Sequence, residues 1–322
     1  MTSSPEFKVL DPNLQISFYY RLRELKDRYL LNSLSETVKI LDISIIDQEL
    51  SDHVKKECLN KLASFGLRGE VVFPVPYVLK SNPFLLGYYR LLLGLSQKEF
   101  YNQGPFGRFK HMEDKGYISR NAEPYIEALC ESLIRSAEIL VNGIDYFTLS
   151  GINELQLLTL GAQLRGSKNT ELGQTATNET FALIREIVKP YIVSEKEKSI
   201  TIKNDSGRIV KIEFFSDPDI RIIEKLRSGE RPLVSVEIKG GTDSSNIHNR
   251  LGEAEKSHQK ARSNGFHEFW TILRVDIDYR EAKKATPTTS HFFHLDRIRD
   301  PEQREYAEFR EILSSLLGIK VE

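Results

Sequence analysis

The chain has 322 residues, of which 40% are hydrophobic and 28% are charged, and its 45 basic and 46 acidic residues give a formal net charge of −1. This length suits two domains or one large one, and the balanced charge excludes a global positive field, so a nucleic-acid partner would have to meet a local basic surface. The two cysteines, Cys58 and Cys130, lack a CxxC spacing and exclude a disulfide framework and a cysteine zinc site.

The first segment, MTSSPEFKVLDP, lacks a basic region followed by an apolar one, so no signal peptide is predicted. No apolar run in the sequence approaches the length of a membrane span. Together with the few cysteines, these features predict a cytoplasmic protein with no membrane partner.

The first part of the chain has helical patterns. From about residue 14 to residue 65, apolar side chains repeat at three- and four-residue spacing. Residues 69–79, GEVVFPVPYVL, predict an extended segment, since Pro74 and Pro76 oppose a helix. Three more helices are expected, at residues 87–102, 122–144 and 154–164. Residues 1–150 are therefore predicted to form a mainly helical N-terminal region.

The pattern changes after about residue 170. A helix is expected to begin at an N-cap, Thr177 or Asn178, and to end before Pro190. Residues 199–215 alternate apolar and polar side chains around Asn204-Asp205-Ser206-Gly207, which predicts a β-hairpin. The remaining expected elements are a strand at 232–239, a helix at 248–265, a strand at 268–277, a polar loop, the segment 290–298 and a helix at 301–318. Residues 151–322 are therefore predicted to form an α/β domain with a mixed β-sheet core flanked by helices.

The end of the strand at 232–239 carries the charges that raise a functional question. Residues two apart in a strand share a face, so Glu237 and Lys239 are expected on the face opposite Val236 and Ile238. Burying two opposite charges there is unfavourable unless they have partners or a chemical task. Asp219 lies a short way upstream, after Pro218, and is expected to supply a second carboxylate at the same place.

This set of residues predicts a metal-assisted hydrolytic site. Two carboxylates, Asp219 and Glu237, together with water and phosphate oxygens, suit Mg²⁺. Lys239 would hold or deprotonate a water, and the cations would offset the charge that develops on a phosphodiester under attack. Gly240-Gly241 would let a nucleic-acid backbone approach the strand end. The alternative interpretation is a surface strand whose Glu and Lys form a solvated ion pair of little energetic value.

The order of these residues resembles a known nuclease motif. Pro218-Asp219, followed by Glu237-Ile238-Lys239, is similar to the PD-(D/E)xK motif of restriction-endonuclease-like nucleases. Two longer blocks, EIKGGTDSSNIHNRLGEAEKSHQKAR at 237–262 and LGAQLRGSKNTELGQTATNETFALI at 160–184, resemble the XcyI family of type II restriction endonucleases. The two blocks cover the second half of the chain, and the longer one is far more specific than the three-residue motif.

The resemblance implies a restriction-endonuclease-like fold and a Mg²⁺-dependent, homodimeric enzyme that cuts double-stranded DNA at a palindrome, which is CCCGGG in that family. It also implies 5′-phosphate ends and a cognate DNA methyltransferase that protects the same site. Asp219, Glu237 and Lys239 occupy the motif positions, with Asp217 as an alternative to Asp219. The competing hypotheses are a PD-(D/E)xK nuclease for DNA repair or junction resolution, and a DNA-binding module without catalysis.

Several basic and amide side chains are candidates for DNA contact. Arg165, Lys168 and Asn169 could grip a phosphate or read a guanine edge, because Arg pairs bidentately with guanine O6 and N7. Lys256 and Lys260 are candidates because their helix follows the metal-binding strand. The alternatives are a polar loop between helices for the first three residues and a solvated helix face for the two lysines.

A few further acids and histidines are weaker candidates for metal binding or catalysis. Glu179 and Glu186 lie on the expected helix before the hairpin, where related nucleases often place an extra metal-linked acid, but a solvated glutamate is the favoured interpretation for each. His248-Asn249 with His258 is superficially similar to an HNH nuclease, but the hairpin expected between the histidines is missing. His291 and His294 are favoured as core or loop histidines over zinc ligands.

Overall fold

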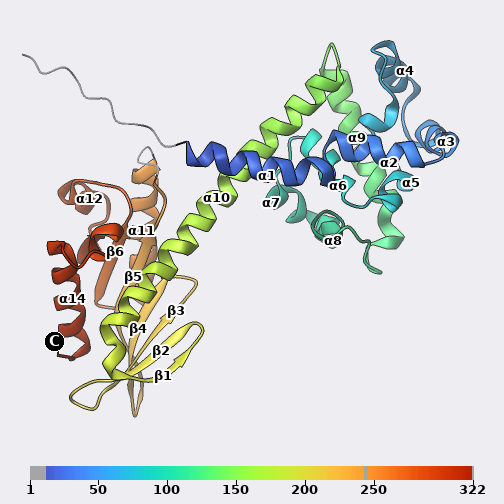
Figure 1. Ribbon diagram of the computed structural model, residues 1–322. Coiled ribbons are helices and arrows are strands. Elements are labelled where there is room, and N and C mark those ends of the chain that lie inside the picture. Colours follow the sequence, from blue (N-terminus) through green and yellow to red (C-terminus); the bar gives the residue numbers. More distant parts are fainter. Residues whose placement is uncertain (1–11, 243–245, 321–322) are drawn as a thin grey trace, which may run out of the picture. The chain divides into compact units, whose positions relative to one another are not determined.

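The structure is a computed structural model that describes residues 12–242 and 246–320. The chain forms two compact units, Met1–Gly166 and Ser167–Glu322 (Figure 1). Helix α10 (Leu149–Val188) contributes its first part to one unit and its remainder to the other. The domain division at residues 150 and 151 stays a prediction about independent folding, because α10 runs through that position without a break.

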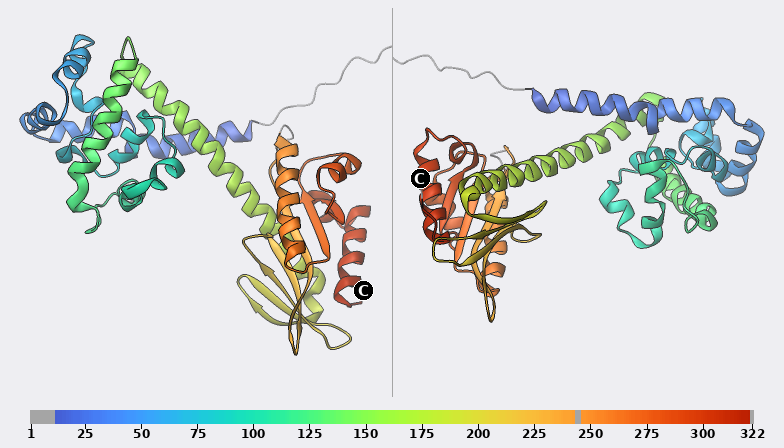
Figure 2. Two further views of the ribbon diagram at one scale, coloured as in Figure 1. Left: turned by 180° about the vertical axis from the view of Figure 1, so that it is seen from behind. Right: turned by 60° about the horizontal axis from the view of Figure 1, so that its bottom comes forward.

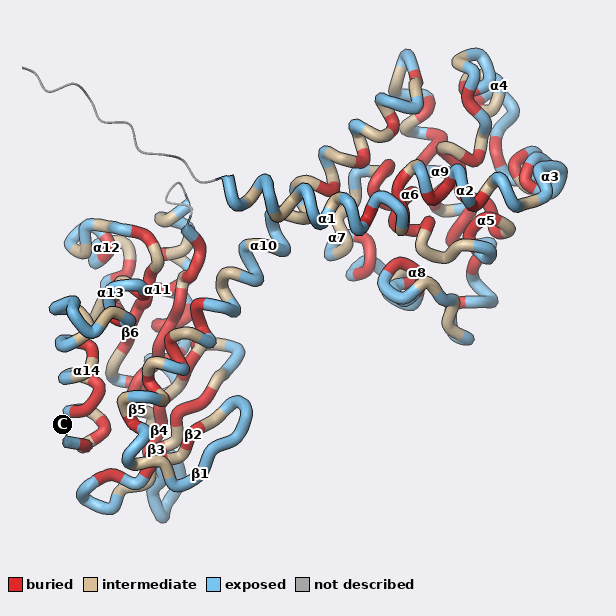
Figure 3. The backbone as a smooth tube through the Cα atoms, in the orientation of Figure 1, coloured by how far each residue is buried: buried red, intermediate tan, exposed pale blue. Residues whose placement is uncertain are grey.

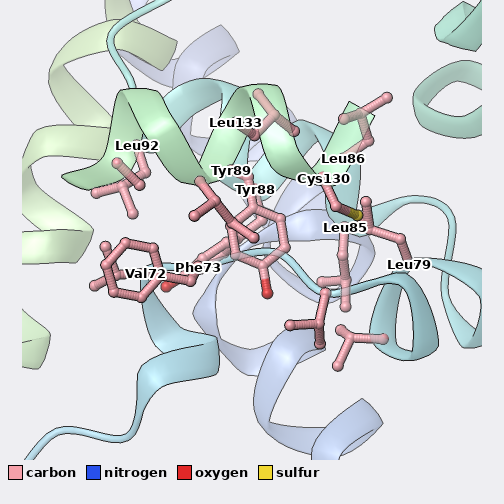
Figure 4. Packing of buried hydrophobic residues seen from close by; sticks show 14 of the residues in the cluster. Val72, Phe73, Leu79, Leu85, Leu86, Tyr88, Tyr89, Leu92, Cys130 and Leu133 are labelled. Carbon is pink, nitrogen blue, oxygen red and sulfur yellow. The ribbon is translucent and has the colours of Figure 1, made fainter. Parts of the chain in front are cut away.

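The first unit is built from helices, as the sequence predicts. Its elements before α10 are α1 (Asn13–Tyr29), α2 (Leu31–Ile40), α3 (Ile43–His53), α4 (Lys56–Ser64), η1 (Gly69–Val71), α5 (Pro76–Ser81), α6 (Leu85–Leu92), α7 (Gln97–Tyr101), η2 (Gly104–Phe109), α8 (Lys110–Lys115), η3 (Glu123–Tyr125) and α9 (Ile126–Gly143). Figure 4 shows part of its core, where Tyr88 and Tyr89 of α6 pack among leucines and Cys130 of α9. Both cysteines of the chain are buried free thiols.

Two predictions for this unit are wrong in detail. The segment 69–79 is not extended, because Pro76 occupies the first turn of α5, where its missing N–H removes no helical hydrogen bond. The segment 87–102 is not one helix either. Gly94 adopts a φ of 74° between α6 and α7, a left-handed conformation that ends a helix and suits glycine.

Helix α10 is the largest departure from the predicted elements. The two helices expected at 154–164 and from Thr177 or Asn178 onward are one helix of 40 residues, so neither Thr177 nor Asn178 is an N-cap. A single interior glycine such as Gly166 weakens a helix without ending it, and packing of the helix within both units outweighs that cost. Its end at Val188 does match the expected stop before Pro190.

The second unit contains one seven-stranded mixed sheet of order β1-β2-β3-β4-β5-β6-β7. The strands are β1 (Ile192–Lys196), β2 (Ser199–Lys203), β3 (Ile209–Phe214), β4 (Ile220–Leu226), β5 (Gly229–Lys239), β6 (Glu268–Leu273) and β7 (His291–His294). Strands β1 to β5 pair antiparallel in sequence order, and β5, β6 and β7 pair parallel. The predicted hairpin is β2–β3, whereas β1 and β4 are not among the predicted elements. The mixed sheet with flanking helices confirms the predicted fold class.

Helices cover both faces of this sheet. The other elements of the unit are η4 (Lys189–Tyr191), α11 (Ile247–Ser263), α12 (Tyr279–Ala285), α13 (Leu295–Ile298) and α14 (Arg304–Leu317). The second half of α10 and α14 share one apolar core with Val234, Val236 and Ile238 of β5. Helix α11 lies over the opposite face (Figure 2). The C-terminal half of β5 is therefore buried (Figure 3), which is usual for a strand with parallel pairing.

The glycines after β5 serve protein packing. A Cβ atom on Gly240 would lie 2.1 Å from Cβ of Ala176 in α10, and one on Gly241 would lie 2.4 Å from Nη2 of Arg250. The Arg250 guanidinium also donates to the Gly241 carbonyl oxygen over 2.6 Å. The expectation that these glycines admit a nucleic-acid backbone is therefore wrong, because α10 and an arginine of α11 occupy the space.

No helix within the two described ranges is both long enough and apolar enough to cross a membrane.

Candidate active site

The centre of the candidate site is the carboxyl end of β5. Glu237 and Lys239 point to the same face, and Oε1 of Glu237 lies 2.8 Å from Nζ of Lys239. Their side chains are only 10% and 16% exposed, because α11 covers this face of the sheet. The interpretation as a solvated surface ion pair is therefore wrong.

Asp219 joins this pair from the neighbouring strand. It directly precedes β4, whose residue Ile220 pairs with Val236 of β5 in the antiparallel ladder. Its Oδ2 accepts a hydrogen bond of 2.8 Å from the backbone N–H of Ile238. Burial and the nearby charge of Glu237 raise the pKa of the Asp219 carboxyl to about 6. Two carboxylates therefore repel each other at the strand end, which is the electrostatic setting of a cation site.

Asp217 lies in a different environment from Asp219. Its carboxylate accepts hydrogen bonds from the Ser257 hydroxyl, over 2.5 Å, and from the Lys260 ammonium, over 2.7 Å. Burial opposes ionisation of Asp217, but these hydrogen bonds outweigh it and lower its pKa. Asp217 is thus tied to α11, whereas Oδ1 of Asp219 has no hydrogen-bond donor among the described residues.

Helix α11 brings two further side chains that the sequence pattern did not single out. The Ser257 hydroxyl lies 2.8 Å from Oε2 of Glu237 and also contacts Asp217, so its single proton is shared between the two carboxylates as a hydrogen-bond donor. Glu253 places Oε2 3.6 Å from Nζ of Lys239. Ser257 and Glu253 lie about one helical turn apart on α11. Only the packing of α11 on the sheet brings them close to β5.

Lys239 is held as a cation by its surroundings. Burial by itself lowers the pKa of a lysine, but the charge and hydrogen bond of Glu237, followed by Asp219 and Glu253, outweigh burial and raise it. The side chain therefore carries its proton at neutral pH in this arrangement. A protonated lysine donates hydrogen bonds to a water or a phosphate oxygen and stabilises negative charge.

The histidine alternatives are not supported. His258 is a fully buried residue of α11, and its ring lies 2.9 Å from the Thr271 hydroxyl and 3.4 Å from that of Ser235. Burial lowers the pKa of His258 to about 4, so it is a neutral core residue. His291 and His294 both lie on β7, and residues three apart on a strand face opposite sides.

The predicted DNA-contact residues are distributed over two helices. Arg165, Lys168 and Asn169 lie on the uninterrupted α10 and not on a loop, and Lys168 pairs with Glu171 over 3.2 Å. Lys256 is exposed on α11. Lys260 shares the helix with Lys256, but its charge is already paired with Asp217.

Neither of the two extra helix acids contacts Asp219, Glu237 or Lys239 within the described ranges. Glu179 forms ion pairs with Arg274 and, over 3.1 Å, with Arg299. Glu186 is exposed and pairs with two basic neighbours in sequence, Arg185 of α10 and Lys189 of η4. These contacts favour structural ion pairs over a share in metal binding.

The donor set of this site fits a hard divalent cation such as Mg²⁺. Within residues 12–242 and 246–320, no group of three or more His, Cys, Asp or Glu side chains is arranged to hold a metal, so the chain offers two carboxylates, Asp219 and Glu237. Mg²⁺ usually keeps several waters and takes one or two carboxylates plus substrate phosphates. A pair of repelling carboxylates matches that requirement.

We predict that Asp219→Asn stabilises the protein in the absence of divalent cations. The pKa of Asp219 lies above the ordinary aspartate value in the folded state, so the folded protein binds more protons and this group contributes stability that is lost as pH rises from about 4 to about 6. Asparagine carries no charge at neutral pH, so the variant does not lose this stability. Its free energy of unfolding near pH 7 should therefore exceed that of the wild type by about 1 to 3 kcal/mol.

Denaturant unfolding with EDTA, at pH 4 and at pH 7, measures this difference between the two proteins. Mg²⁺ should then stabilise the wild type and leave Asp219→Asn nearly unchanged, because only the wild type keeps the cation site. A variant that is less stable than wild type at pH 7, or that gains as much from Mg²⁺, would remove Asp219 from the proposed cation site.

Comparison with known proteins identifies relatives over almost the whole chain. A family model described as XcyI restriction endonuclease matches residues 19–320. The chain is 43% identical over 316 residues to the type II restriction enzyme Cfr9I of Citrobacter freundii, a match that covers 96% of each protein. It is 42% identical over 326 residues to the type II restriction enzyme XcyI of Xanthomonas campestris pv. cyanopsidis, covering 99% of this chain and 98% of that enzyme.

Proposed function

The chain belongs to the XcyI restriction endonuclease family and is a type II site-specific deoxyribonuclease, and we propose that Asp219, Glu237 and Lys239 form its active site, with Mg²⁺ as cofactor. The observation that carries this proposal is the convergence of two carboxylates and a largely buried lysine at the end of β5. Asp217 has a supporting role, since its carboxylate is bound by Ser257 and Lys260.

In the proposed reaction, a water attacks the phosphorus of a phosphodiester in line with the leaving 3′ oxygen. A new O–P bond forms and the P–O3′ bond breaks, which leaves a 3′ hydroxyl and a 5′-phosphate. Lys239 donates hydrogen bonds that orient the water and stabilise the charge on the phosphate oxygens. Asp219 and Glu237 would hold the cation, and when bound it would supply Lewis-acid stabilisation of the developing charge.

We propose the palindrome CCCGGG as the recognition sequence and 5′-phosphates at the ends. Incubating the protein with plasmid DNA that carries one such site, with Mg²⁺ or with EDTA, and sequencing the ends tests both statements. Cleavage in Mg²⁺ at CCCGGG alone supports the proposal. Cleavage at another sequence corrects the specificity, and equal cleavage in EDTA contradicts the role of a divalent cation.

We also propose that the enzyme acts as a homodimer on double-stranded DNA. A palindrome has two-fold symmetry, and one active site per strand matches it most simply. Sedimentation of the protein on a short duplex with one site is therefore expected to show two protomers per duplex. A single protomer that cuts both strands of an intact site would contradict this prediction.

The proposed cellular setting follows from the same activity. An enzyme that cuts this palindrome is compatible with its host only if the host's own sites are protected, so a cognate DNA methyltransferase for the same sequence is part of the proposal. A cytoplasmic location is proposed for the same reason, because that is where the substrate DNA and the methyltransferase would meet.

We predict that Ser257→Ala lowers cleavage at limiting Mg²⁺ by about 10- to 100-fold, the usual effect of removing a residue that orients a metal ligand. The Ser257 hydroxyl is the contact that α11 makes with Oε2 of Glu237. Ser263→Ala is the matched control, because its hydroxyl is bound to the Gln259 carbonyl oxygen on the exposed side of the same helix. Wild-type cleavage by Ser257→Ala across a Mg²⁺ titration would show that Glu237 needs no such support.

A further inference from the structure

A surface cavity opens beside Asp219 within the second unit. Its volume is about 710 Å³, and its lining includes Asp219, Gln174 and Asn178 of α10, the turn residues Glu197 and Lys198 between β1 and β2, and Phe215. None of these residues except Asp219 belongs to the proposed catalytic set. A molecule in this cavity would lie next to a carboxylate that the reaction uses.

Two amide side chains form one wall of the cavity. Gln174 and Asn178 lie four residues apart on α10, so they share a face of the helix, and Nε2 of Gln174 donates to Oδ1 of Asn178 over 3.2 Å. This hydrogen bond orients both amides and leaves the Gln174 oxygen and the Asn178 NH₂ group for another partner. The nearby Thr177 hydroxyl is already used, because it donates to the Gly173 carbonyl oxygen over 3.0 Å.

The position of Asn178 is itself informative. Asparagine is a poor helix former, and here it lies in the interior of a 40-residue helix with its side chain exposed. It does not cap a helix. Its amide oxygen accepts the hydrogen bond from Gln174, four residues earlier, and its NH₂ group is left for a ligand at this face.

The lining of the cavity also includes an aromatic side chain that is held in place. The Phe215 ring is 47% exposed, and the Arg221 guanidinium lies 3.9 Å from its centroid. The backbone N–H of Phe215 donates to the Asp219 carbonyl oxygen over 3.0 Å, which fixes the turn that carries both residues. An exposed aromatic side chain fixed beside Asp219 offers apolar contact to the edge of a nucleotide base.

The charge of the lining argues for bases over phosphates. A surface that follows the DNA backbone is predominantly basic. Here Lys198 is accompanied by two acids, Glu197 and Asp219, and by two neutral amides. Such a mixture of donors and acceptors matches the edges of bases, where amides make paired hydrogen bonds and a carboxylate accepts from the cytosine amino group.

We propose that this cavity receives base pairs of the DNA substrate next to the scissile phosphate, and that Gln174 and Asn178 read their edges as specificity-determining residues. The inference rests on the proposed function of the neighbouring site. It assigns sequence recognition to the part of α10 that passes Asp219, in addition to the Arg165, Lys168 and Asn169 segment. Because the residues for recognition and Asp219 line the same cavity, a correct base pair and a correctly placed phosphate would be sensed together.

The test compares Gln174→Ala and Asn178→Ala with wild type on a duplex that carries the recognition site and on a panel of its single-base-pair variants. Each substitution should lower kcat/KM on the correct site, and the discrimination against wrong base pairs at one or two positions should fall by about 10- to 100-fold. The salt dependence should not change, because no phosphate contact is lost. Thr175→Ala is the matched control, since Thr175 is exposed on the same helix and does not line the cavity.

Two outcomes would overturn the inference. One is unchanged discrimination in both variants. The other is an equal loss on every sequence with a weaker salt dependence, which would mark a phosphate contact. Both require a wild-type enzyme that cuts its site, so they are distinct from a failure of the proposed function, in which the wild type would cut no duplex DNA with Mg²⁺. Thermal melts of the two variants exclude misfolding as a cause of any loss.

Discussion

Glu237→Ala is expected to abolish Mg²⁺-dependent cleavage, with a rate at least about 10³-fold below wild type, because it removes one of the two carboxylates that would hold the cation and the partner that orients Lys239. Binding of duplex DNA should persist, since affinity comes mainly from phosphate and base contacts. Glu237→Gln should be equally inactive, because it keeps the shape and a hydrogen bond to Ser257 but not the charge.

Two controls separate catalysis from folding for this residue. Removing one partner of a largely buried ion pair destabilises a protein, so thermal melts must place the assay temperature below the melting point of each variant. Glu230→Ala changes an exposed acid at the other end of β5 and should cut at the wild-type rate. A Glu237→Ala enzyme that cuts like wild type would exclude this residue from the active site.

Lys239→Ala should also lose cleavage, and saturating Mg²⁺ should not restore it, because the missing group is not a metal ligand. The surroundings of Lys239 keep it protonated, so the structure favours a role as hydrogen-bond donor and positive charge over a role as base. Lys239→Arg should restore activity poorly. Its planar guanidinium has a different shape from an ammonium group and would have to fit a space that Glu237, Glu253 and α11 enclose.

The alternative for Lys239 predicts a different pattern. If it were only the ion-pair partner of Glu237, both substitutions would change the free energy of unfolding and leave cleavage intact. Cleavage assays over a Mg²⁺ range, with thermal melts of the same proteins, distinguish the two cases. Lys225→Ala, at an exposed position of β4, is the matched control. Near-normal cleavage by Lys239→Ala would break the proposed link between this strand and the chemistry.

Two short-range patterns in the sequence were sufficient to predict the common face of Glu237 and Lys239 and the β2–β3 hairpin. The period of two along a strand places Glu237 and Lys239 on one face whatever the rest of the fold does. The hairpin around Asn204–Gly207 follows from turn chemistry in the same way. Each depends on neighbours only a few residues apart.

The sequence alone could not separate Asp217 from Asp219, since both flank Pro218 and have the same chemistry. What distinguishes them is α11, whose Ser257 and Lys260 lie about 40 residues away along the chain and bind Asp217. Asp219 is left beside Glu237 because β4 pairs with β5 in one register. Packing between distant elements makes this assignment.

The errors in the helical segments have one physical origin. Local signals such as Pro76, Gly94 and Gly166 have modest energies, of about 1 kcal/mol for an interior glycine, and their effect depends on the packing around them. Pro76 begins a helix, Gly94 ends one, and Gly166 lies within α10. Proline and glycine both disfavour the interior of a helix. Whether the chain starts, ends or continues a helix at such a residue is decided by the tertiary packing around it.

The sequence by itself therefore determined the fold class and the charged face of β5, because these depend on patterns that local geometry repeats along the chain, and the resemblance of two sequence blocks indicated the family. Only the tertiary structure decided which aspartate remains available, that α10 is continuous, and that Gln174 and Asn178 lie beside Asp219. These facts depend on contacts between residues tens of positions apart. Burial and hydrogen bonding in the packed state stabilise those contacts. The local periodicity of the sequence therefore does not predict which distant residues make them.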